Sequence, residues 1–153
     1  MKKFKFTLQS VLNLKNSIEK QQRAELAAAD ARIRALEEEL AAINLRHAVT
    51  RERFNREIRE GISSTELLVY STGFKVLRDK AAHQKRRILA AEEERRRIQL
   101  RLLETMKERK ALEKLKARHL EEYREELRRE DERIMDDFMS NKVTALLDGG
   151  ANG

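Results

Sequence analysis

The side chains best suited to metal or acid–base chemistry are three histidines and two runs of glutamate. His47, His83 and His119 lie too far apart in the sequence to form a local metal pair. Glu37–Glu39 and Glu92–Glu94 are consecutive, and neighbouring helical residues point about 100° apart, so each run gives a solvated surface and not a cation cage. We expect His47 in a helix seam, the other histidines on the surface, and no metal-binding or catalytic residue.

Nucleotide and thiol chemistry are not indicated either. The sequence has no glycine-rich loop followed by Lys and Ser or Thr, the pattern that binds ATP phosphates. It has no cysteine, so it can form neither a disulfide framework nor a thiolate metal site. We therefore expect no cofactor and no enzymatic activity.

Two basic runs, Lys85–Arg87 and Arg95–Arg97, are the remaining polar motifs. Because glutamates flank them, an exposed helix face is the favoured interpretation, and docking on an acidic protein is the second. Nucleic-acid binding is disfavoured, since acidic residues interrupt every basic stretch.

The composition predicts long helices. In 153 residues, 40% are charged, 5% are aromatic and none is proline, which is typical of extended helical proteins. No apolar run approaches the roughly 18 residues that cross a bilayer. Lys2 and Lys3 are not followed by the apolar stretch of a signal peptide, so we expect a cytosolic location.

One short stretch predicts a reversal of chain direction. Gly61 is the residue type that most readily takes the left-handed conformation ending a helix. Ser63 lies three residues before Glu66, the spacing of a capping box, and Ile62 with Leu67 has the spacing of a hydrophobic staple. We expect a turn at about residues 59–66.

Both sides of this turn show apolar positions that alternate in steps of four and three, the pattern of a coiled-coil seam. Gln22 marks a stutter in the first seam, because two steps of four meet there. The first seam runs through Leu26, Ala29, Ile33, Leu36, Leu40, Ile43, His47, Thr50 and Phe54. The second runs through Leu67, Tyr70, Phe74, Leu77, Ala81, Gln84, Ile88, Ala91, Arg95, Ile98 and Leu102.

These patterns predict an all-α fold, a long two-helix antiparallel coiled-coil hairpin over residues 1–147, with residues 148–153 as a disordered tail. Pairing about the turn brings Phe54 near Tyr70 and Phe74, and Ala29 opposite Arg95. Residues 1–35 hold eight basic and three acidic side chains, whereas residues 102–153 hold eleven and thirteen, so the paired segments attract one another. Beyond Leu102 the alternation loosens, and the periodicity does not decide how much of residues 103–140 is paired.

At about 1.5 Å per residue, a helix from Thr7 to Glu60 is roughly 80 Å long. A two-helix rod of this length has almost no interior beyond its seam, so it cannot enclose a catalytic pocket. The protein is expected to act by contact.

Two stretches of the sequence resemble a known family. The opening Phe4-x-Phe6-x-Leu8-Gln9-x-Val11-Leu12 resembles the start of FliJ proteins, components of the flagellar type III export apparatus. The later part is similar to that family's C-terminal pattern in Arg109-Lys110-Ala111-Leu112-Glu113-Lys114-Leu115-Lys116, then Tyr123, then Asp136-Asp137-Phe138.

The resemblance implies a stalk-like, non-enzymatic protein whose paired terminal helices enter the ring of the flagellar export ATPase (FliI). It also implies contacts with the export gate protein FlhA and with substrate chaperones. The expected location is then the cytoplasmic face of the inner membrane, peripheral to it through the export apparatus. No nucleic-acid partner is expected.

Two sets of contact residues follow from this layout. The ATPase contact is expected at basic residues of the two paired ends: Lys2, Lys3, Lys5, Arg124, Arg128 and Arg129. The export-gate contact is expected at the turn end: Phe54, Tyr70, Phe74 and Leu77. The alternatives that stay open are a related injectisome stalk protein, and a basic coiled-coil scaffold or nucleic-acid-associated structural protein.

Overall fold

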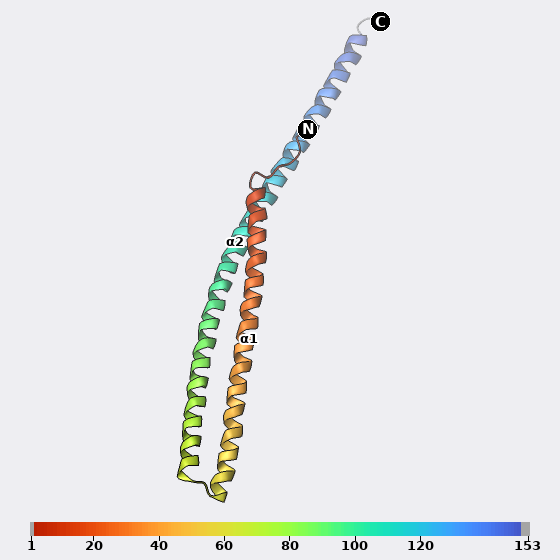
Figure 1. Cartoon of the computed structure of the whole chain (residues 1–153). Helices are drawn as coiled ribbons and strands as arrows, with labels where there is room; N and C mark the ends of the chain where they lie inside the picture. Colours follow the sequence, from red (N-terminus) through yellow and green to blue (C-terminus); the bar gives the residue numbers. More distant parts are fainter. Residues whose placement is uncertain (1, 151–153) are drawn as a thin grey trace. The chain divides into compact units, whose positions relative to one another are not determined.

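The computed structural model describes residues 2–150, which form two long helices and, within that range, no strand. Helix α1 spans Gln9–Glu60 and helix α2 spans Ser64–Gly150. The two run antiparallel and lie side by side, joined by the turn at the bottom of Figure 1. This confirms the predicted antiparallel coiled-coil hairpin.

The described residues fall into two compact units, which are considered separately below. The turn unit comprises residues 17–105 and includes the turn itself. The end unit comprises residues 2–16 together with residues 106–150. A single domain over residues 1–147 stays a prediction.

The turn owes its form to two residues that the sequence singled out. Among the described residues, Gly61 alone has a positive φ, at 93°. It therefore ends α1 in the left-handed conformation, which residues with a side chain disfavour. Ser63 caps α2, because its Oγ accepts a hydrogen bond from the Glu66 backbone N–H at 3.2 Å. The Ser63 carbonyl then accepts the first bond of the new helix, from Leu67 N at 3.0 Å.

The seam of the turn unit coincides with the one read from the sequence. The predicted positions are buried or half-buried, except Leu67, and the residues between them are mostly exposed. Leu67 is 48% exposed, so its place in the seam was predicted wrongly; it lies in the first turn of α2. Leu36 is 3% exposed on α1, and its counterparts on α2 are Leu77, Ala91, Ile98 and Leu102 at 5–8%. Burying a leucine-sized side chain contributes about 1.5–3 kcal/mol, whereas an i,i+4 ion pair such as Arg23–Glu19 contributes a few tenths. The seam therefore supplies most of the stability.

Gln84 is a polar residue at the centre of this seam, only 3% exposed. Its Nε2 donates to the Leu36 carbonyl at 2.8 Å and to a Glu39 carboxylate oxygen at 3.0 Å. Its own Oε1 accepts a hydrogen bond from Arg87 at 3.1 Å. A buried amide costs free energy unless it is hydrogen-bonded, so these bonds favour one register of α1 against α2.

Arg95 also occupies a predicted seam position and is half-buried. Its guanidinium Nε donates to the carboxylate of Asp30, the residue next to Ala29 on α1. The ion pair fixes an arginine that an apolar seam alone would exclude.

In the end unit, the chain before α1 lies against α2. Phe6 is 7% exposed, and its ring meets the ring of His119 edge-on at a centroid distance of 5.8 Å. Leu12, in the first turns of α1, is 4% exposed, and Lys15 forms an ion pair with Glu108. His119 is half-buried, so the prediction of a surface histidine was wrong there, because Phe6 covers its ring.

The stretch after Leu102, whose pairing the periodicity left open over residues 103–140, is paired for about two thirds of its length. Half-buried side chains continue in α2 as far as Leu127, and many of them are polar: Arg109, Lys116, His119 and Tyr123. From Arg128 to Gly150 every residue is exposed. The loosened hydropathy pattern reflects polar residues that occupy seam positions with their aliphatic or aromatic portions.

Helix α2 continues through Asp148, Gly149 and Gly150, where the sequence predicted the start of a disordered tail. No proline or tertiary contact interrupts the helix there, and glycine lowers helix stability by only about 1 kcal/mol per residue. The rest of that predicted tail, residues 151–153, lies outside the described residues.

Leu36→Ala should lower the free energy of unfolding by about 2–5 kcal/mol, because it leaves a cavity at the most buried leucine of the seam. The matched control is Leu45→Ala on the same helix, where the side chain is 65% exposed and the loss should stay below about 0.5 kcal/mol. Urea unfolding followed by circular dichroism at 222 nm measures both. Equal losses in the two variants would contradict this seam.

Candidate protein-interaction surfaces

Aromatic side chains gather in the turn unit, as the sequence predicted. Phe54 lies 5.1 Å from Tyr70 and 5.5 Å from Phe74 between ring centroids, and the rings of Tyr70 and Phe74 stack at 6.3 Å. His47 joins them, 5.3 Å from Phe74, as the predicted seam histidine. We call His47, Phe54, Tyr70 and Phe74 the aromatic cluster; all four are half-buried.

The aromatic cluster therefore closes the seam and also keeps part of each ring accessible. A depression of about 540 Å³ opens onto it, lined by both helices and flanked by two arginines: His47, Arg51, Phe54, Asn55, Ser71, Phe74 and Arg78. Leu77, the fourth predicted gate residue, is 8% exposed and belongs to the core of the turn unit.

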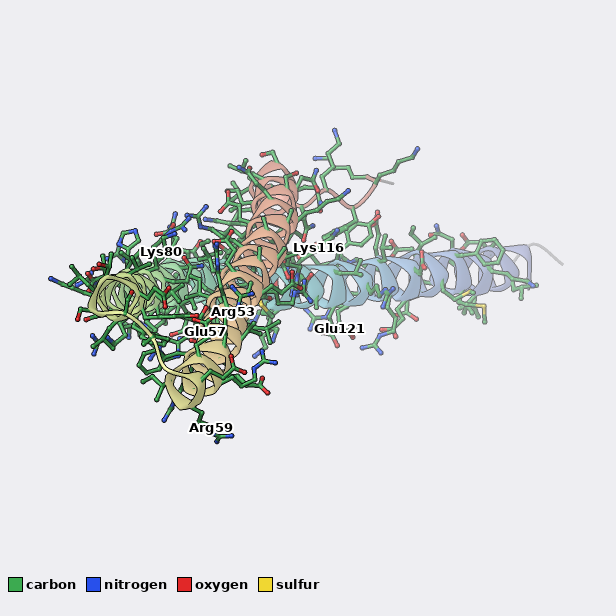
Figure 2. All side chains as sticks on the ribbon, turned by 60° about the horizontal axis from the view of Figure 1, so that its bottom comes forward. Arg53, Glu57, Arg59, Lys80, Lys116 and Glu121 are labelled. Atoms are coloured by element: carbon green, nitrogen blue, oxygen red, sulfur yellow. The ribbon has the colours of Figure 1, made fainter. Side chains whose placement is uncertain are left out.

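Tyr70 is linked to the opposite helix by a hydrogen bond. Its hydroxyl donates to a carboxylate oxygen of Glu57 at 2.6 Å. This hydrogen bond, with smaller contributions from desolvation and the negative charge of Glu57, raises the pKa of Tyr70 above its ordinary value. Figure 2 labels Glu57 on α1 near the turn, together with Arg59, which points away from the hairpin into solvent.

The same unit carries a second apolar surface, which the heptad pattern does not predict. Leu68 and Val69 are each 67% exposed, and Val76 is 46% exposed. They occupy positions outside the seam, which the heptad pattern assigns to solvent. Apolar residues at positions outside the seam are the sequence signal that could have indicated this surface.

In the end unit, the predicted basic residues Lys2, Lys3 and Lys5 are all exposed. The non-helical stretch that carries them is held on α2 by the Phe4 and Tyr123 rings, 5.6 Å apart, and by the Tyr123 hydroxyl, which donates to the Lys2 carbonyl. The three lysines line a depression of about 630 Å³ with Glu126 and Glu130.

Arg124, Arg128 and Arg129 are exposed on the same part of α2. Arg128 and Arg129 pair with Glu125 at 3.4 Å and 3.7 Å. Since helical residues rotate by about 100° each, the three arginines lie on other sides of α2 than Tyr123 and Leu127, which face the lysines. The predicted basic residues surround one helical segment and do not form a single patch.

Further along α2, large apolar side chains are exposed together with acidic ones. Ile134, Met135, Phe138 and Met139 are 53–62% exposed, and Val143, Leu146 and Leu147 are 52–71% exposed. Asp136 and Asp137 lie among them.

Across residues 2–150, no three His, Asp or Glu side chains come together as a metal site. Neither helix, as described, contains a segment long and apolar enough to cross a bilayer.

In a Tyr123→Phe variant, Tyr70 is the one tyrosine left and the chain has no tryptophan, so absorbance at 295 nm reports its ionisation alone. We expect a midpoint above the ordinary value of about 10. Between that value and the raised pKa, the folded protein keeps a proton that the unfolded chain has lost. The stabilisation from this hydrogen bond is therefore fully present below about pH 10 and is lost as pH rises through the folded pKa.

Adding Glu57→Gln should return the midpoint toward the ordinary value, because the charged acceptor is gone. A midpoint that does not respond to Glu57→Gln would show that the Tyr70–Glu57 bond is absent in solution.

Comparison with curated proteins and with solved structures found no match. A family model, that of the flagellar FliJ protein, matches residues 4–144. The match covers all of α1 and α2 as far as Thr144, and it confirms the resemblance first indicated by the two ends of the sequence. FliJ proteins are structural components of flagellar protein export and not enzymes. The chain belongs to the FliJ family, and it is a component of the flagellar export apparatus.

Proposed function

We propose that the protein is a stalk-like coiled coil that binds the ring of the flagellar export ATPase (FliI) and couples it to the export gate protein FlhA and to substrate chaperones. It works in the cytoplasm, peripheral to the cytoplasmic face of the inner membrane. The observation that carries the proposal is the family match over residues 4–144. The exposed lysines and arginines of the end unit and the half-buried aromatic rings of the turn unit also support it.

The ATPase contact is assigned to the end unit, at Lys2, Lys3, Lys5, Arg124, Arg128 and Arg129. Two features support this assignment. The ring contact between Phe4 and Tyr123 fixes the lysine-bearing stretch on α2, so its charges are held in place before binding. The arginines lie on other sides of the same helix, and charges distributed around a helix suit an element that a ring of subunits encloses.

The gate contact is assigned to the turn unit, at Phe54, Tyr70, Phe74 and Leu77. Aromatic side chains are favoured anchors in protein interfaces because they bury a large area at a low entropy cost. The open depression beside the aromatic cluster supports the assignment, since a partner's side chain can reach Phe54 and Phe74 from that side. Leu77 has little exposed surface and contributes mainly by supporting the seam beneath.

Reversing the three lysines, in a variant with Lys2, Lys3 and Lys5 all changed to Glu, should weaken the apparent affinity for the purified export ATPase by roughly tenfold. Exposed ion pairs contribute about 0.2–1 kcal/mol each, and this variant reverses the charge of three lysines. ATP hydrolysis, measured as a function of added protein, reports the affinity, and the effect should shrink at high salt.

The matched control reverses three other exposed lysines of the end unit, Lys107, Lys110 and Lys114. Its affinity should stay close to that of the parent. If both triple variants weaken stimulation equally, net charge and not the assigned contact explains the effect; if neither does, the contact lies elsewhere.

Phe74→Ala should lose gate binding by on the order of 10–30-fold while ATPase stimulation persists, because the two contacts lie in different units. The ring is half-buried, so we also expect a stability loss of about 1–3 kcal/mol, below that of a fully buried ring. Pull-down of the cytoplasmic domain of FlhA, on protein shown to be folded, measures the loss.

Tyr70→Phe serves as the control, because it removes the hydroxyl bonded to Glu57 but keeps the ring. It should retain gate binding, whereas Tyr70→Ala should not. Gate binding that is indifferent to both Tyr70→Ala and Phe74→Ala would exclude the aromatic cluster as an anchor.

A further inference from the structure

Two adjoining depressions form a groove along α1 and α2 of the turn unit. Their volumes are about 590 Å³ and 520 Å³, and they share Arg46 and Thr50. The apolar residues that line them come from both helices and include Leu45, Val49, Leu68, Val69 and Val76. We call this surface the valine groove.

The valine groove is apolar and open. Leu45, Leu68 and Val69 are 65–67% exposed, and Val49 and Val76 are 51% and 46% exposed. Single exposed apolar residues are common on protein surfaces, but a contiguous group of them usually marks a binding surface. None of these side chains is buried by any other described part of the chain.

The charged residues that line the valine groove are all basic. Its lining includes Arg46, Arg53 and Lys80 and no acidic residue; Figure 2 labels Arg53 on α1 and Lys80 on α2. By contrast, the alanine-lined depression further along the turn unit mixes Glu25 and Glu94 with its arginines. In a chain with 27 acidic residues, a lining without any favours an acidic partner.

Gly73 lines the valine groove and lies inside α2, as the tenth residue of that helix. A glycine in a helix interior lowers the stability of the helix relative to alanine. Gly73 has no positive φ, and a methyl group built on it would have nothing within 4 Å. The described fold therefore gives no reason for glycine here, whereas close approach of another backbone does.

We propose that the valine groove binds an amphipathic α-helix of a partner protein, which packs as a third helix with apolar residues at i, i+3, i+4 and i+7 and acidic residues beside them. The apolar residues of the valine groove pack against the apolar side of that helix. Gly73 and Thr72 allow the two backbones to approach closely, and Arg46, Arg53 and Lys80 pair with the acidic residues of the partner helix. The groove lies on the other side of the seam from the depression at Phe54 and Phe74, so the inference goes beyond the gate contact proposed above.

The partner is a different protein and not a second copy of this chain. Residues 131–148 of α2 do have exposed apolar and acidic side chains, but docking them into the valine groove of another copy would join two different surfaces. Contacts of that kind are heterologous, and unless the rotation closes them into a ring they build open filaments.

The test uses two labelled synthetic helices of about 20 residues with the same leucine and valine stripe, one flanked by glutamate and the other by lysine. Fluorescence anisotropy with the full chain should give a dissociation constant at least tenfold lower for the glutamate helix, and the difference should narrow as salt is raised. Equal binding of the two helices, or binding of neither, would overturn the proposal.

Leu68→Asp should weaken binding of the glutamate helix at least tenfold without unfolding the protein, because its side chain is exposed. The matched control is Leu100→Asp, also on α2 of the turn unit and 56% exposed, which should bind as the parent does. Equal loss in the two variants would show that the groove is not the binding surface.

Gly73→Ala separates a binding role from a folding role. It should raise the melting temperature by about 2–4 °C, since the helix gains alanine without a clash, and weaken binding of the glutamate helix several-fold. Unchanged binding would overturn close approach at Gly73.

A sedimentation coefficient that rises with protein concentration in the parent, but not in Leu68→Asp, would show instead that a second copy fills the groove.

Discussion

Two antiparallel helices share one face, and this constraint governs the chain. In the turn unit, each helix can bury only the side chains that point at the other, which is a stripe at alternating steps of four and three residues. No residue of the described chain is buried below 2% exposure, because no third layer covers the pair. Stability therefore comes from many partial burials along the seam, and the remaining surface is available for contacts.

The polar residues of the seam decide how the helices align. An apolar stripe of similar side chains can slip by a heptad at small cost, since one leucine or alanine replaces another. Gln84 cannot slip, because its amide must reach the Leu36 carbonyl and Glu39, and a slipped register would bury it without partners. Arg95 with Asp30 acts in the same way, about one turn of α2 after Ala91. At the stutter, Gln22 has a buried side-chain oxygen without a hydrogen-bond partner, so that position lacks such a bond to fix its alignment.

The same constraint explains how a protein without an enclosed pocket can take part in protein export. The accessible side chains of residues 2–150 lie on the outer faces of the helices, and the two units differ in their chemistry. The end unit presents lysines and arginines on several sides of α2, while the turn unit presents aromatic rings on one side of the seam and the valine groove on the other. Separate partners can bind such surfaces without displacing one another.

The sequence alone determined the fold, because helix propensity, the glycine turn and the Ser63 cap are local effects and the seam is a strict periodicity. It also placed Phe54 with Tyr70 and Phe74, since a turn of known position fixes an antiparallel register. Only the tertiary structure decided which polar residues are half-buried and which exposed apolar residues form a common surface. Arg109, Lys116 and His119 are polar by type yet half-buried, because their accessibility depends on which residues of the opposite segment cover them. Likewise, Leu68, Val69, Val76 and Gly73 have unremarkable positions in the sequence, and they form one surface only when α1 brings Leu45, Arg46 and Val49 beside them.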